Sequence, residues 1–172
     1  QASKASQTGQ VAQFAAAGKS MSKKDLAAIA MSYGYVYVAQ VAMGADKNQT
    51  LKALAEAEAY HGPSIVIGYA PCEMHGIKGG MKNCQDEMDK AVKAGYWQLF
   101  RYNPANKAAG KPAFTLDSKA PTTDYIDFIK NENRYNRLAQ QFPERAEKLF
   151  EEAKEHAAAK YERLTKLGEL YN

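Results

Sequence analysis

The chain has 172 residues, of which 45% are hydrophobic and 24% charged, a composition typical of one ordinary globular domain. Its net charge of +4 comes from 23 basic and 19 acidic residues mixed along the chain, so we expect no nucleic-acid partner. Two cysteines are too few for a disulfide framework, and neither a leader nor an apolar run of about 18 residues occurs, so we expect a cytoplasmic protein without a membrane span.

The amino-terminal part of the chain predicts two short helices. Small apolar residues at 11–17 end at Gly18, which indicates a helix closed by a glycine. Ser22 and Asp25 then form a capping-box pattern, which predicts a second helix that reaches Met31.

A strand, a helix and another strand are predicted next. Residues 35–43 are rich in Val and Tyr, which is typical of a buried strand. Asp46 or Asn48 caps a helix that ends near Gly62, and residues 64–70 read as a second buried strand. Alternating helices and strands with such short connections predict the α/β fold class, with a partial parallel sheet flanked by helices.

The remaining chain divides into a loop-rich part and a helical part. A glycine-bearing loop precedes a helix at 85–94, and strands follow at 96–102 and 113–116. From residue 122 onward the pattern is only helical, so we divide the chain into residues 1–121 and a helical extension at 122–172 that packs on them. Apolar residues recur in that extension at a helical period, which predicts a docked face: Ala146, Leu149, Phe150, Ala153, Ala157, Tyr161, Leu164 and Leu167.

Cys72 is the strongest candidate for chemistry. It follows Pro71 at the carboxyl end of a predicted buried strand, the edge of an α/β sheet where ligands gather. Taken alone, such a cysteine is a small buried hydrophobe, a nucleophile or a metal ligand. Cys84 lies twelve positions further on, a spacing that matches no zinc or ferredoxin motif. His75 could pair with Cys72 as a base, but no third group is identifiable, and a loop histidine is the simpler interpretation.

Several stretches, taken in order, resemble the carboxy-terminal part of the single-chain pyruvate:ferredoxin (flavodoxin) oxidoreductases, in the thiamine-diphosphate-binding domain of the 2-oxoacid:ferredoxin oxidoreductase family. They are QASKASQTGQVAQFAAAGK, KKDLAAIAMSYGYVYVAQVAMGADKNQTLKALAEAEAYHGPSIVIGYAPC, HGIKGGM, AVKAGYWQLFRYNP and FTLDSK. The resemblance runs from Gln1 to about Tyr135 and continues more weakly beyond. A chain that begins at Gln1 without Met fits a piece of a longer protein.

The resemblance implies half of a thiamine-diphosphate-binding fold in an enzyme that decarboxylates pyruvate oxidatively to acetyl-coenzyme A. It implies that Cys72 is the fourth ligand of a 4Fe–4S cluster whose other three cysteines lie upstream, and that Gln1 follows the loop that holds the Mg²⁺ of thiamine diphosphate. Ferredoxin or flavodoxin accepts the electrons in that family, pyruvate and coenzyme A are the substrates, and the parent enzyme is expected to be a homodimer. Met74 stands where many members have Asn, and Cys84 receives no role.

Because the other cluster ligands and the magnesium motif lie outside the 172 residues, we expect the chain alone to be inactive and to bind none of these cofactors. An alternative from another functional class is a stand-alone α/β scaffold or interaction module that uses its last helix for docking.

Overall fold

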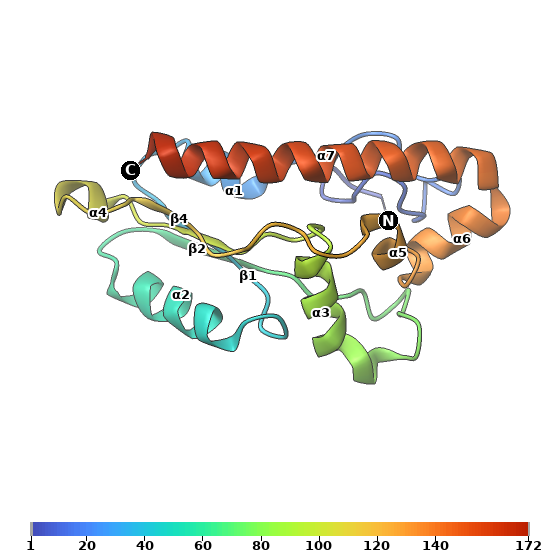
Figure 1. Ribbon diagram of the computed structural model, residues 1–172, viewed down its shortest axis with the longest axis horizontal. Helices are drawn as coiled ribbons and strands as arrows, with labels where there is room; N and C mark the ends of the chain where they lie inside the picture. The colour runs from blue at the N-terminus through green and yellow to red at the C-terminus, as the bar shows by residue number, and fades with distance from the viewer. Residues whose placement is uncertain (1, 172) are drawn as a thin grey trace.

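A four-stranded mixed sheet forms the centre of the molecule, with helices on both faces (Figure 1). In this computed structural model, which describes residues 2–171, the strands are β1 (Tyr37–Val41), β2 (Ser64–Gly68), β3 (Phe100–Tyr102) and β4 (Phe114–Leu116). Their order is β2-β1-β3-β4. The pair β1 and β2 is parallel, whereas β3 is antiparallel to both β1 and β4. The predicted α/β class is confirmed, and within residues 2–171 the parallel pairing is confined to β1 and β2.

The helices divide between the two faces of the sheet. α1 and the long α7 lie over one face, and α2 lies beneath the other (Figure 1). No helix in residues 2–171 is both long and apolar enough to cross a bilayer. The helical bounds are α1 (Leu26–Met31), α2 (Lys47–Ala59), the 3₁₀ turn η1 (Met81–Asn83), α3 (Cys84–Lys93), α4 (Ala105–Ala108), α5 (Tyr125–Ile129), α6 (Asn133–Gln141) and α7 (Pro143–Leu170).

Strand β1 carries core residues on both of its faces. All five of its residues are buried, and alternate side chains point to opposite sides because a strand has a period of two. Tyr37, Ala39 and Val41 pack with Ala53 of α2, whereas Val38 joins the core on the other face. The side chains of β1 therefore contribute to the hydrophobic core on both faces of the sheet.

Helix α7 docks on the molecule through the apolar face that the sequence predicted. Ala146, Leu149, Phe150, Ala153 and Leu164 are buried. Burying one Leu or Phe side chain contributes roughly 1.5–3 kcal/mol, so this face holds the helix firmly. A boundary between residues 1–121 and 122–172 stays a prediction.

The predicted helix at residues 11–17 is wrong. The segment forms turns, and Phe14 adopts a positive φ of 69°. Its backbone instead bonds to distant partners, since the amide of Val11 donates to the carbonyl of Arg134 at 2.8 Å. Seven residues are too few to hold a helix without tertiary support, so these long-range bonds prevail.

Three other predictions needed correction. Asp25, and not Ser22, is the N-cap of α1, because its carboxylate accepts from the amide of Ala28 at 3.0 Å. The strand predicted at 96–102 begins only at Phe100. The strand predicted as buried at 64–70 is partly exposed, because β2 lies at an edge of the sheet with no neighbour on its outer side within residues 2–171.

Candidate functional site

The loop that carries Cys72 begins at one edge of the sheet. Because β1 and β2 are parallel, their carboxyl ends lie together there, and the amide of Tyr69 still donates to the carbonyl of Val41 at 3.0 Å. Pro71 is buried, and the next residue, Cys72, is a free thiol that is partly exposed. The thiol therefore lies where α/β proteins commonly place ligand-binding groups.

Cys72 and His75 form a close pair. The amide of Gly76 donates to the carbonyl of Cys72 at 2.8 Å, and this turn brings Sγ of Cys72 within 3.1 Å of Nδ1 of His75. Desolvation and the positive charges of Arg134 and Arg137 lower the pKa of His75. No group in residues 2–171 hydrogen-bonds Nε2 of this histidine, so the described part of the chain offers no third member of a nucleophilic triad.

The start of α6 and the residues just before it hold this loop from the other side. The amide of Lys78 donates to the carbonyl of Asn131 at 2.9 Å, and the amide of Asn133 donates to the carbonyl of Gly76 at 3.2 Å. The side-chain amide of Asn133 also donates to the carbonyl of His75 at 2.8 Å. Sequence reasoning missed this clamp, because a polar Asn in the first turn of a helix has no local feature that reveals its distant partner.

A buried polar cluster lies behind the loop. Glu132, which is 1% exposed, accepts hydrogen bonds from the hydroxyl of Tyr69 and from Nε of Arg134. The hydroxyl of Tyr96 lies 3.0 Å from the hydroxyl of Tyr135 and accepts a hydrogen bond from the guanidinium of Arg134 at 3.4 Å. Burial and the charge of Glu132 raise the pKa of Tyr69. This cluster joins the end of β2 to α6, so the Cys72 loop rests on a rigid base.

Cys84 lies apart from this arrangement, the loop glycines belong to its turns, and Gln1 is outside the described residues. Cys84 is the first residue of α3 and partly exposed. Gly76, Gly79 and Gly80 all have positive φ, as turn glycines do. Gln1, predicted to lie near the thiamine diphosphate loop, is outside the described residues.

The residues present fit a shared iron–sulfur site better than a complete one. A partly exposed thiol on an anchored loop suits a single cluster ligand, since iron in such clusters is bound by soft thiolates. Residues 2–171 contain no group of three or more His, Cys, Asp or Glu side chains that could hold a metal ion. Any cluster bound by Cys72 therefore takes its remaining ligands from other polypeptide.

Comparison with known proteins shows which enzymes this chain resembles. No protein-family model matches the chain. The pyruvate:ferredoxin oxidoreductase of Moorella thermoacetica is 57% identical over 98% of this chain and 14% of its own length. The pyruvate-flavodoxin oxidoreductase of Klebsiella pneumoniae is 52% identical over 98% of this chain and 14% of its own length. The chain is homologous to one segment of the pyruvate:ferredoxin and pyruvate-flavodoxin oxidoreductases.

The similarity extends to more distant oxidoreductases with the same pattern of coverage. The pyruvate-flavodoxin oxidoreductase of Nostoc sp. is 44% identical over 94% of this chain and 13% of its own length. The NADP-dependent pyruvate dehydrogenase of Euglena gracilis is 40% identical over 98% of this chain and 9% of its own length. The chain thus spans only a small part of these relatives, and a stand-alone scaffold is not favoured.

Proposed function

We propose that this chain is a segment of an enzyme that oxidatively decarboxylates pyruvate to acetyl-coenzyme A and passes the electrons to ferredoxin or flavodoxin. The observation that supports the proposal is the identity of 40–57% over 98% of the chain to oxidoreductases named for pyruvate. The rest of the parent polypeptide is then the principal partner, and the parent enzyme is a cytoplasmic homodimer.

Within that enzyme, Cys72 supplies one thiolate to a 4Fe–4S cluster. Such a cluster accepts and donates single electrons, as a one-electron carrier such as ferredoxin or flavodoxin requires. The chain's own residues position the sulfur: Gly76 and His75 shape the turn, and Asn133 holds it against α6. A ring nitrogen 3.1 Å from the sulfur is also placed to donate a hydrogen bond to a thiolate.

Thiamine diphosphate and its Mg²⁺ are held elsewhere in the parent enzyme, with Gln1 beside the loop that binds them. Mg²⁺ prefers oxygen ligands in octahedral geometry, and residues 2–171 offer no cluster of carboxylates for it. The isolated chain is therefore inactive and forms no magnesium-dependent complex with thiamine diphosphate at micromolar concentration.

The activity is tested on the full-length protein that contains this segment. Purified anaerobically, it should reduce ferredoxin or flavodoxin only when pyruvate and coenzyme A are both present. Reduction that does not depend on pyruvate would contradict the proposal.

The role of Cys72 is tested by a matched pair of variants of the same full-length protein. Cys72→Ala should lose the iron of one cluster and its reduced-cluster resonance, while Cys84→Ala should retain both, because only Cys72 lies on the anchored loop at the sheet edge. Iron analysis and electron paramagnetic resonance measure the difference. Equal cluster content in the two variants would rule out Cys72 as a ligand.

A further inference from the structure

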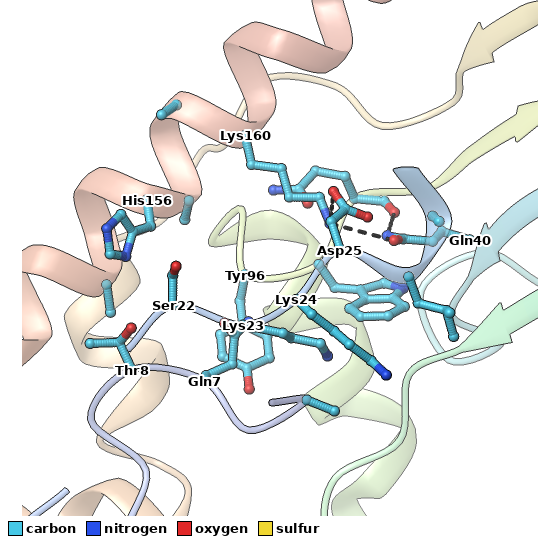
Figure 2. A pocket seen from close by; sticks show the side chains of 18 of the residues that line it. Gln7, Thr8, Ser22, Lys23, Lys24, Asp25, Gln40, Tyr96, His156 and Lys160 are labelled. Atoms are coloured by element: carbon cyan, nitrogen blue, oxygen red, sulfur yellow. Dashed lines mark hydrogen bonds and ion pairs between the residues drawn. The ribbon is translucent and has the colours of Figure 1, made fainter. Parts of the chain in front are cut away.

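A pocket of about 510 Å³ opens between α7, the segment before α1 and the sheet (Figure 2). Four basic side chains line it: Lys23, Lys24, Lys160 and Arg163. Asp25 is the only acidic residue that residues 2–171 contribute to the lining. The volume lies within the range of about 300–1,000 Å³ that small-molecule sites occupy. Its charge therefore favours an anionic occupant of modest size.

Lys23 and Lys160 both lie close to the ring of Trp97. Nζ of Lys23 lies 5.2 Å from the centre of the Trp97 ring, and Nζ of Lys160 lies 6.0 Å from it. Each contact is favourable by itself, but two ammonium groups near one indole repel each other. Desolvation and the positive charge of Lys160 lower the pKa of Lys23, and desolvation lowers that of Lys160. An anion between them would relieve this repulsion.

The one carboxylate of the pocket is already engaged. Asp25 lies 3.6 Å from Nζ of Lys160 and also pairs with Arg163. It caps α1 as well, through the amide of Ala28. Neither Lys23 nor Lys24 forms an ion pair with any group in the described part of the chain. In Figure 2, Lys160 comes from α7, and Lys23 lies across the pocket on the segment before α1.

The indole itself is held rigidly below the charges. Trp97 is only 6% exposed, and its Nε1 donates to the carbonyl of Val41 at 3.0 Å. The hydroxyl-bearing residues Thr8 and Ser22 also line the pocket. The site thus combines a fixed apolar floor with ammonium groups and hydroxyls, a set of groups that suits clustered anionic oxygens.

We infer that this pocket binds a small phosphate-bearing molecule, with its anionic oxygens against Lys23 and Lys160. Lysine binds phosphate as a compact point charge with three donors, and two lysines on opposite sides of the pocket can contact different oxygens of the same group. The inference rests on the pocket alone and does not depend on the proposed enzymatic function. An acidic peptide segment is the competing occupant.

The single tryptophan of the chain makes the test direct. Inorganic pyrophosphate is titrated into the 172-residue chain at low ionic strength, with Trp97 fluorescence and calorimetry as readouts. Potassium chloride at matched ionic strength is the reference. We expect a saturable change with pyrophosphate only, and a dissociation constant that rises with added salt, because exposed charges are screened.

Three variants assign the binding to the pocket. Lys23→Gln and Lys160→Gln should each weaken pyrophosphate binding about tenfold, which is the loss expected for one charge-assisted contact. Lys52→Gln serves as the control, because Lys52 is an exposed lysine of α2 on the opposite face of the sheet. Circular dichroism confirms that each variant is folded, and Lys23, which is exposed before α1, is the less disruptive site.

Two kinds of result would contradict the assignment of phosphate to this pocket. Absence of saturable binding, or equal affinity in Lys23→Gln and Lys52→Gln, would overturn the inference. A tetra-glutamate peptide is titrated in a parallel arm. If that peptide binds more tightly than pyrophosphate, the phosphate assignment is wrong and the pocket accepts an acidic segment.

Discussion

The side-chain amide of Asn133 donates a hydrogen bond to the carbonyl oxygen of His75 at 2.8 Å and so fastens the Cys72 loop to the first turn of α6. The backbone amide of Asn133 adds a second bond, to the carbonyl of Gly76 at 3.2 Å. The position of the thiol therefore depends on a residue that lies far along the chain.

Replacing Asn133 should loosen the loop without unfolding the molecule. Asn133→Ala removes one side-chain hydrogen bond, which contributes about 1 kcal/mol, so local opening should become roughly fivefold more frequent. We expect the rate at which a thiol reagent labels Cys72 in the native state to rise by that factor. Mass spectrometry of labelled peptides measures it, with Cys84 as internal comparison.

Gln140→Ala is the control for this effect, because Gln140 is an exposed residue of the same helix. In the Gln140→Ala variant, the thiol reagent should label Cys72 at the same rate as in the unaltered chain. If Asn133→Ala also leaves the rate unchanged, the clamp does not determine access to the thiol.

The buried tyrosines should make the fold sensitive to alkaline pH. Burial, aided by the charge of Glu132, raises the pKa of Tyr96 to about 12 from an ordinary value of 10.0. The folded state therefore holds this proton more tightly than the unfolded state, and the stabilisation is fully present below pH 10 and lost as the pH rises toward 12. At pH 11 the loss from this residue alone should be about 1 kcal/mol.

Urea unfolding at pH 9 and pH 11 tests the tyrosine prediction. In Tyr96→Phe the decline in unfolding free energy between these pH values should be smaller by about 1 kcal/mol, because the titrating group is gone. Tyr33 is 61% exposed, so in Tyr33→Phe the unfolding free energy should fall between these pH values by as much as in the unaltered chain. An unchanged decline in Tyr96→Phe would contradict the raised pKa.

Gly18 should tolerate no side chain. It has a φ of +77°, and a Cβ there would lie 2.7 Å from Cδ2 of Leu138. Gly18→Ala combines backbone strain with overpacking, so we expect it to lower the unfolding free energy by about 2 kcal/mol. Urea denaturation measures the change.

The same substitution at Gly168 should stabilise the molecule. Gly168 lies within α7, and a Cβ there would meet no atom of residues 2–171 within 4 Å. Gly168→Ala should raise the unfolding free energy by up to about 1 kcal/mol, because alanine has the higher helix propensity. Similar effects of the two substitutions would show that the packing at Gly18 is not restrictive.

The sequence by itself determined the features that depend on neighbouring residues. The cap at Asp46 and the apolar face of α7 are local signals, and the structure contains both. The alternation of helices and strands predicted the α/β class, and the position of Cys72 after a strand followed from the same pattern. Such signals survive because hydrogen bonding within a helix and periodic burial act over a few residues.

Only the tertiary structure decided the features that depend on chain reversals. The segment at 11–17 forms turns and a backbone bond from Val11 to Arg134 in place of its predicted helix, and β3 joined the sheet antiparallel to β1. The meeting of Lys23 and Lys160 over Trp97 has no local pattern to reveal it. The physical reason is that the free energy of such contacts comes from partners brought together by the whole fold, and spacing along the sequence carries no information about which partners meet.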